Sequence, residues 1–131
     1  MDELEEIRNR KLKELEESLN KSPLPDVPIE LTDQDMDKAL SNYPKLVIDC
    51  WAVWCGPCRM VAPTIEALAK EKAGDIVFGK LDIDNNPKTA MKYAITAVPT
   101  MLVFKDGQPA GRVLGALPKQ QLEIKIAELL K

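Results

Sequence analysis

Histidine is absent from this sequence of 131 residues, and cysteine is scarce. Without histidine, the chain can carry neither Cys–His catalysis nor a zinc site that needs imidazole. Its three cysteines cannot all pair within one chain, and two of them lie only three positions apart. A structural disulfide framework is therefore not expected, and a reducing compartment is favoured.

Long apolar runs and an excess of one charge are also missing. No apolar run approaches the roughly 20 residues that cross a bilayer, and the charged N-terminus lacks the apolar centre of a signal peptide. The 18 basic and 21 acidic residues are mixed along the chain and leave a net charge of −3. This balance gives no electrostatic basis for binding nucleic acid or an anionic membrane. We therefore expect a cytoplasmic protein with neither of these partners.

An amphipathic segment opens the chain. Residues 1–22 are predicted to form a helix, because opposite charges recur at i,i+4 and the apolar side chains share one stripe. The stripe consists of Leu4, Ile7, Leu12, Leu15 and Leu19. The proline-rich residues 23–28 end the helix as an extended linker, and 29–131 form the globular domain. We expect the stripe to dock on the domain's own surface near Ile124.

The globular part alternates strand and helix patterns, and 45% of the chain is hydrophobic, which is enough to bury one core. One predicted helix begins at Thr32, and a second follows the cysteine pair and ends at about residue 72. A third covers 87–93, and the last begins at Pro118. Predicted strands cover 29–31, 45–53, 75–82, 100–105 and 109–115, the last two as a hairpin. This order predicts an α/β sheet with helices on both faces.

Cys55 and Cys58 stand where a buried strand meets a helix. The strand fixes the first sulfur, and the helix start offers it unpaired N–H groups and the positive end of a dipole. Both effects stabilise the thiolate, which is the nucleophile in disulfide exchange. The spacing therefore indicates reversible disulfide chemistry. Half of a metal site and two inert thiols remain as alternatives, although no other suitably spaced ligands accompany the pair.

In such chemistry Cys55 attacks a client disulfide, and Cys58 then resolves the mixed disulfide by attacking the Cys55 sulfur. Cys58 lies one turn inside the helix, so we expect it to be more buried than Cys55. The third cysteine, Cys50, lies in the apolar strand and is predicted to be a small buried hydrophobe.

A carboxylate, Asp49, also lies in this apolar strand. An unpaired charge there is expensive, so burial is expected to raise its pKa. Asp49 can then hold a proton near neutral pH and exchange it with Cys58 through a water. The alternative is an aspartate satisfied by backbone donors or by Lys80. Lys80 in turn either pairs with Asp49 or is solvated at a strand edge.

The stretch Trp54-Cys55-Gly56-Pro57-Cys58 resembles the signature of the thioredoxin family. The resemblance covers residues 27–131 and continues through Asp49, Trp51, Pro63, Lys80, Val98-Pro99-Thr100 and Gly115. It implies the thioredoxin fold, a mixed sheet of about five strands flanked by helices on both faces. In this chain an N-terminal helix is added to that fold.

The resemblance also implies roles for single residues. Asp49 transfers the proton, while Gly56, Pro57 and Lys80 tune the redox pair, and Gly-Pro between the cysteines belongs to the reducing members of the family. A cis Val98–Pro99 bond is expected opposite the first cysteine; a proline that merely begins a strand is the alternative. The client-binding rim is expected to consist of Trp54, Ala97, Val98, Pro99 and Gly115, with Trp51 packed beneath.

The function implied by the resemblance is reduction of protein disulfides through a Cys55–Cys58 disulfide, with no further cofactor and no metal. Client proteins and a thioredoxin reductase are the expected partners, because the chain has no dinucleotide fingerprint of its own. We expect a monomer. One alternative is a disulfide oxidase or isomerase, against which Gly56-Pro57 and the missing export signal count. Another is a binding module that recruits a partner through its N-terminal helix.

Overall fold

Five strands form one mixed sheet in the computed structural model, which describes residues 3–20 and 24–131. The strands lie in the order β1-β3-β2-β4-β5. β1 and β2 run parallel to β3, whereas β4 is antiparallel to β2 and β5 is antiparallel to β4. Their bounds are β1 (Ile29–Leu31), β2 (Lys45–Trp51), β3 (Val77–Asp82), β4 (Thr100–Lys105) and β5 (Gln108–Leu114).

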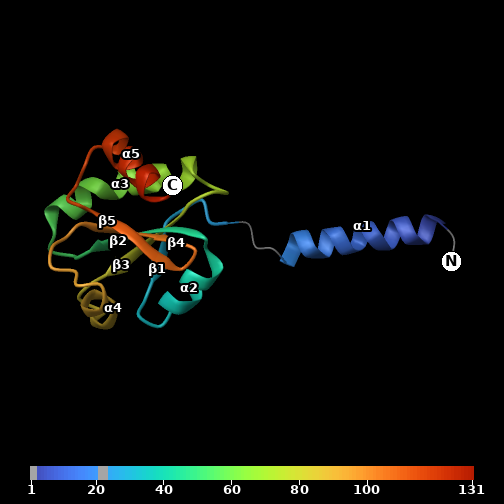
Figure 1. The fold of residues 1–131 in the computed structure, drawn as a ribbon, viewed down its shortest axis with the longest axis horizontal. Coiled ribbons are helices and arrows are strands. Elements are labelled where there is room, and N and C mark those ends of the chain that lie inside the picture. Colours follow the sequence, from blue (N-terminus) through green and yellow to red (C-terminus); the bar gives the residue numbers. More distant parts are fainter. Residues whose placement is uncertain (1–2, 21–23) are drawn as a thin grey trace.

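Helices cover both faces of this sheet, as the sequence predicts. Figure 1 shows α3 and α5 on one face and α2 and α4 on the other. Their bounds are α2 (Met36–Asn42), α3 (Gly56–Glu71), α4 (Pro87–Lys92) and α5 (Lys119–Leu129). The arrangement follows from β2, whose residues 46–50 are all buried, so that neither face of the strand can be left to water.

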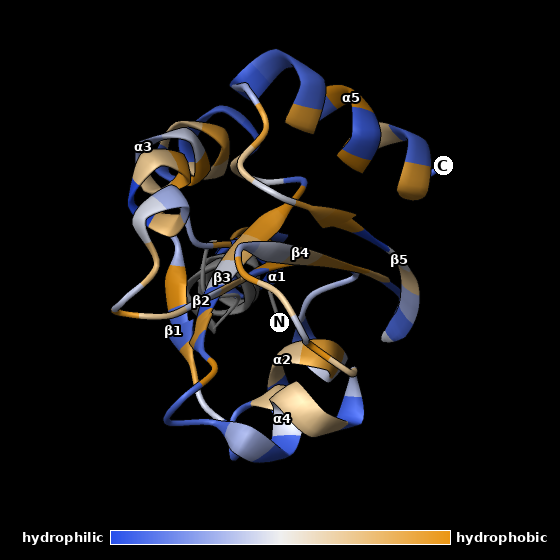
Figure 2. Ribbon diagram, turned by 90° about the vertical axis from the view of Figure 1, so that its left-hand side faces the viewer, coloured by the Kyte–Doolittle hydropathy of each residue, from blue (hydrophilic) through white to orange (hydrophobic). Residues whose placement is uncertain are grey.

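Two apolar layers therefore form, one on each side of β2. Val47 points toward α3 and α5 together with Phe78, while Leu46 and Ile48 point toward the opposite layer. Figure 2 shows hydrophobic segments of α3 and α5 turned toward the sheet. Because side chains alternate along a strand, Asp49 lies on the same side of the sheet as Val47, beneath α3.

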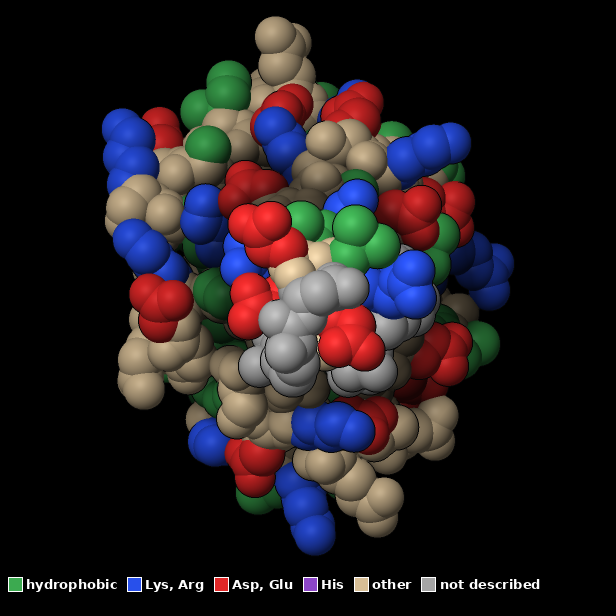
Figure 3. Space-filling model, turned by 90° about the vertical axis from the view of Figure 1, so that its right-hand side faces the viewer, with side chains coloured by type: hydrophobic (Ala, Val, Ile, Leu, Met, Phe, Trp, Pro, Cys, Tyr) green, Lys and Arg blue, Asp and Glu red, His purple; other side chains and the backbone are tan. Residues whose placement is uncertain are grey.

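The N-terminal helix α1 spans Glu3–Asn20 and lies outside this sheet and its covering helices (Figure 1). Leu4, Ile7 and Ile124 are all exposed, so the predicted docking near Ile124 is wrong for this structure. Charges at i,i+4 spacing are local interactions, and they support a helix without a second surface. The side chains of Leu12, Leu15 and Leu19 lie outside the described part of the chain. Figure 3 shows acidic and basic side chains interspersed on the side from which α1 projects.

The prediction that a helix begins at Thr32 is also wrong, because α2 begins at Met36. The N–H and hydroxyl of Thr32 donate to Asp35 Oδ2 at 3.2 and 2.9 Å, which closes a turn before the helix. Within that turn, Asp33 Oδ1 accepts the N–H of Thr89 at 2.8 Å and its hydroxyl at 2.6 Å. The segment therefore anchors the start of α4 and does not extend α2.

Ala94 follows Tyr93, the C-cap of α4, and has a left-handed conformation with a φ of 52°. Its N–H donates to the Met91 carbonyl at 3.1 Å, and the N–H of Ile95 donates to the Ala90 carbonyl at 2.8 Å. This is the hydrogen-bond pattern of a Schellman motif, which usually places glycine at the left-handed residue. A β-carbon is disfavoured there by roughly 1–2 kcal/mol.

We therefore expect Ala94→Gly to raise the free energy of unfolding, by roughly 0.5–1 kcal/mol after the greater flexibility of glycine in the unfolded chain is allowed for. Urea denaturation measures this directly. Asp106→Gly is the matched control, because Asp106 has a φ of 51° but aspartate tolerates this conformation better. A loss of stability in Ala94→Gly, or a larger gain in the control, would contradict the prediction.

Candidate active site

A disulfide joins Cys55 to Cys58 at the start of α3, with 5.3 Å between their Cα atoms. Cys55 is the N-cap of α3, and its Sγ accepts the N–H of Cys58 at 3.2 Å. Pro57 lies in the first turn of the helix, where its missing N–H leaves no intrahelical bond unmade. Once the disulfide is reduced, the same N–H and the helix dipole favour a thiolate at position 55.

The two cysteines are equally buried, each with an exposed fraction of 4%. The expectation that Cys58 is the more buried of the two is therefore wrong for this disulfide-bonded form. The reason is geometric, since the bond holds the two sulfurs against each other. Cys50 is fully buried in the layer beneath α2 and α4. Its pKa is raised to about 12, mainly by burial and in addition by the negative charge of Asp49.

Asp49 is buried, and neither of its carboxylate oxygens has a hydrogen-bond partner among the described residues. Burial raises its pKa from 3.8 to about 6, although the positive charge of Lys80 acts in the opposite direction. The alternative in which backbone donors or Lys80 satisfy the carboxylate is therefore not observed. Asp49 is poised to change its charge near neutral pH.

Lys80 stands directly across from Asp49 in the register of β2 and β3. Its Nζ lies over the ring of Trp51, 5.2 Å from the ring centroid, in a cation–π contact. The strand-edge alternative for Lys80 is wrong, because β3 pairs with β1 on one side and with β2 on the other. The lysine therefore contributes its charge to the site without forming an ion pair with Asp49.

A cavity of about 240 Å³ connects the carboxylate with the redox pair. Asp49, Cys58 and Lys80 line it, together with Trp51, Ala52, Val53, Arg59 and Ala62. Polar groups from three elements thus face one space that is large enough for water. Arg59, which the sequence reasoning did not single out, donates from Nη2 to the carbonyl of Val53 at 3.1 Å.

The loop before β4 lies against the redox pair. The Val98–Pro99 bond is cis, as the family resemblance implies, and Val98 packs on the apolar cluster that contains both cysteines. The hydroxyl of Thr100 donates to the Ala97 carbonyl at 2.6 Å, and the N–H of Gly115 donates to the Pro99 carbonyl at 3.0 Å. Four residues of the expected rim are thereby brought together.

Trp54, the fifth residue expected in the rim, directly precedes Cys55 and is 68% exposed. Its indole Nε1 donates to Asp84 Oδ2 at 2.9 Å, so the ring is held from the loop after β3. Asp84 was missed by the sequence reasoning, because a hydrogen bond between positions 30 residues apart leaves no local pattern. Val53 is also exposed beside the tryptophan and adds apolar surface.

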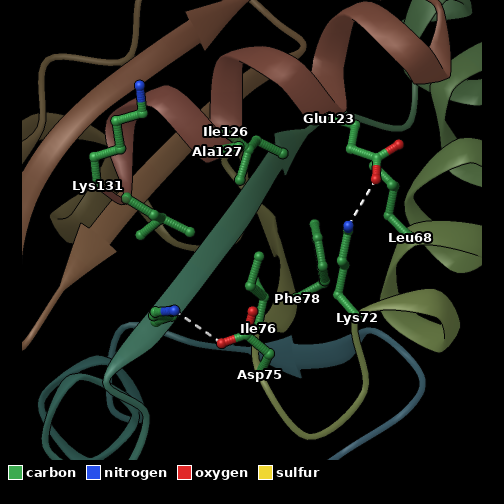
Figure 4. A pocket seen from close by; sticks show the side chains of 11 residues that line it. Leu68, Lys72, Asp75, Ile76, Phe78, Glu123, Ile126, Ala127 and Lys131 are labelled. Carbon is green, nitrogen blue, oxygen red and sulfur yellow. Dashed lines mark hydrogen bonds and ion pairs between the residues drawn. The ribbon is translucent and has the colours of Figure 1, made fainter.

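A second cavity, of about 260 Å³, lies at the other end of the sheet, where β2 begins (Figure 4). Its floor is apolar and includes Phe78, while the ion pairs Lys45–Asp75 and Lys72–Glu123 cross its rim at 2.9 and 2.6 Å. None of the predicted site residues lines it. Its side chains belong to the packing of α3, α5 and β3, and we assign it no role in the redox chemistry.

Membrane-spanning helices and clustered metal ligands are both absent from residues 3–20 and 24–131. No helix there is long and apolar enough to cross a membrane. No group of three or more His, Cys, Asp or Glu side chains in the same part of the chain is arranged to hold a metal ion.

Thiol–disulfide exchange is the chemistry that this arrangement supports, because the two sulfurs close a bond beside an N–H group, a titratable carboxyl and an exposed apolar rim. Together with the five-stranded sheet, it defines a thiol–disulfide oxidoreductase. The family model described as Thioredoxin matches residues 27–128, and the chain belongs to the thioredoxin family. It is a protein-disulfide reductase with a redox-active disulfide.

Individual relatives agree with this placement. Thioredoxins from Staphylococcus epidermidis and Staphylococcus aureus are each 48% identical to this chain over 94 residues, which cover 72% of it and 89% of theirs. A solved structure of a mutant thioredoxin from Halobacterium salinarum NRC-1 has a TM-score of 0.76 and 31% identity. The matched region covers 84% of this chain and 96% of the Halobacterium chain. Family membership implies client proteins with disulfides and a thioredoxin reductase as partners.

Proposed function

We propose that Cys55 is the attacking nucleophile of a reductase for cytoplasmic client proteins. The Cys55 thiolate attacks one sulfur of a client disulfide, so a mixed disulfide forms and the other client sulfur leaves as a thiolate. Cys58 then attacks the Cys55 sulfur, which closes the internal disulfide and releases the second client thiolate. The client gains two electrons, and a separate reductase returns two electrons to the cysteine pair.

Asp49 supplies the proton transfer in this scheme. Cys58 must lose its proton before it attacks, and Asp49 is the titratable carboxyl that lines the same cavity. With a pKa of about 6, it is mostly ionised at neutral pH and accepts that proton through a water. Lys80 tunes the carboxylate by its charge. Pro57 stiffens the turn between the sulfurs, and Gly56 and Pro57 together tune the redox pair.

Client binding is assigned to the exposed rim around the disulfide. Trp54 offers an apolar surface, and Val98 offers backbone groups to an extended client segment. Ala97, Pro99 and Gly115 shape the same rim. The observation that carries the proposal is the position of Cys55 at the start of α3. Its Sγ accepts the N–H of Cys58 at 3.2 Å, and it lies beside the residues of this proposed rim.

The direction of the reaction is tested with the intact protein. We expect catalytic amounts to accelerate the reduction of insulin disulfides by dithiothreitol, and we expect a reduction potential near −270 mV, the reference value for thioredoxin itself. An oxidase or isomerase would instead lie nearer about −120 to −180 mV and would favour disulfide formation or reshuffling. A potential in that range would overturn the assignment as a reductase.

A monomeric, cytoplasmic protein completes the proposal. The mixed surface charge and the absence of a membrane-spanning helix among the described residues are compatible with it. A binding module that acts through α1 remains the second candidate, because Leu4 and Ile7 are exposed. Insulin reduction that is unchanged on removal of residues 1–22 would support the reductase as an independent domain, and failure of the intact chain to reduce insulin would favour the binding module.

A further inference from the structure

An arginine on β5 binds the chain where α4 ends. Arg112 Nη2 donates to the carbonyl of Tyr93 at 2.6 Å, and Nη1 donates to the carbonyl of Ala94 at 3.4 Å. These carbonyls directly follow α4, at the helix end that leaves acceptors unpaired and favours a cation. A guanidinium suits the position, because its N–H groups are held in a rigid plane and can bind two neighbouring acceptors.

Arg112 reaches α4 because of the alternation of side chains along β5. Val113 is buried in the layer beneath α3 and α5, so its neighbour Arg112 points toward the opposite face of the sheet. That face is the one that α4 covers (Figure 1). The hydrogen bonds of Arg112 therefore join β5, the outermost strand, to the end of α4. The loop that carries the cis-proline begins at this same helix end.

This loop, residues 94–99, carries part of the proposed client rim. Its far end is held by the hydrogen bonds of Ala97 to Thr100 and of Pro99 to Gly115. Its near end begins at Ala94, in a conformation that is unfavourable for a residue with a β-carbon. The near end therefore depends on contacts from outside the loop, and Arg112 supplies two of them.

We propose that Arg112 is a positioning residue for client binding, which holds the start of this loop so that Val98 meets the client beside Cys55. The inference rests on the proposed client-binding role of the loop. Arg112 contacts neither sulfur, and its hydrogen bonds end on backbone carbonyls. Its loss therefore weakens the binding of a protein client and leaves the chemistry of the cysteine pair unchanged.

The test compares three variants in the full chain. Arg112→Met removes both hydrogen bonds at similar side-chain length, and Arg112→Lys keeps the charge with a single, flexible donor group. Lys92→Met is the matched control, because Lys92 lies over the Tyr93 ring at 5.5 Å from the ring centroid and carries a charge at the same helix end. The readouts are kcat and KM for insulin, the rate with a small aromatic disulfide, and the reduction potential.

For Arg112→Met we expect KM for insulin to rise about five- to tenfold, as for the loss of one or two modest hydrogen bonds, with kcat within about twofold of the wild type. The rate with the small disulfide and the reduction potential should not change. Arg112→Lys should show an intermediate KM, and Lys92→Met should match the wild type.

Three results would overturn the proposal. One is a wild-type KM in Arg112→Met, or in Arg112→Lys if the methionine variant does not fold. Another is an equal loss of activity toward insulin and the small disulfide, which would indicate a general structural role. The third is an equal effect in Lys92→Met, which would assign the effect to charge. Failure of the wild type to reduce insulin would instead refute the proposed function itself.

Discussion

Cys55→Ser should abolish the reduction of protein disulfides, with a fall in the insulin reduction rate on the order of 10³-fold or more. A serine hydroxyl does not ionise near neutral pH and cannot exchange with a disulfide. The N–H of Cys58 that faces position 55 then has no thiolate to stabilise. Insulin precipitation in the presence of dithiothreitol measures the effect.

Cys58→Ser separates the two steps of the reaction. Cys55 can still attack the client, but the mixed disulfide is not resolved, so a covalent complex should accumulate on non-reducing gels and in mass spectra. Cys50→Ser is the control, because this thiol is buried on the other face of the sheet and its pKa is raised to about 12. Substantial activity in Cys55→Ser, or a trapped complex through Cys50, would refute the assignment of the nucleophile.

Asp49→Asn should stabilise the protein at neutral pH. The pKa of Asp49 is raised by folding from 3.8 to about 6, so the folded state binds the proton more tightly than the unfolded state does. The contribution of Asp49 to the stability of the wild type is therefore fully present below about pH 4 and is lost as the pH rises through about 6. At about 1.4 kcal/mol per pH unit, the loss amounts to roughly 3 kcal/mol.

The asparagine variant lacks this titration. Its free energy of unfolding relative to the wild type should increase by about 3 kcal/mol between pH 4 and pH 7, as measured by urea denaturation at each pH. The same variant should resolve mixed disulfides on the order of 10²-fold more slowly, because Cys58 loses its proton acceptor. Asp37→Asn, at an exposed position on α2, is the control. Parallel pH profiles for wild type and Asp49→Asn would contradict the predicted origin of the shift.

Stability and catalysis are thus opposed at Asp49. The described residues provide the carboxylate with no hydrogen-bond partner, and a neutral side chain of the same shape would be better tolerated at that position. A fully satisfied carboxylate would lose the raised pKa that proton transfer near neutral pH needs. The unpaired aspartate is therefore understandable as a functional feature.

Short-range patterns were sufficient for most of the fold. The apolar run of β2 predicts a strand buried on both faces, and the hairpin of β4 and β5 follows from its turn residues. The position of the cysteine pair at the start of α3 was predicted in the same way. Errors arose at element ends, as at Thr32, where hydrogen bonds to distant residues determine the local conformation.

Contacts between distant segments could not be predicted. Trp54 with Asp84, Lys80 over Trp51, and Arg112 on the end of α4 each join parts of the chain that share no local pattern. The position of α1 was not predicted either, because docking of its apolar stripe was expected near Ile124, whereas Leu4, Ile7 and Ile124 are exposed in this structure.

The sequence by itself indicated the redox chemistry, because two cysteines three positions apart at a helix start bring their sulfurs within bonding distance and place the first beside unpaired N–H groups. The order of apolar runs and turns also determined the sheet and its two covering layers. Only the tertiary structure decided how the carboxyl of Asp49 titrates and what surrounds the disulfide. Both depend on which distant groups exclude water from the site and which hydrogen bonds they leave unmade, and these are properties of the packed chain.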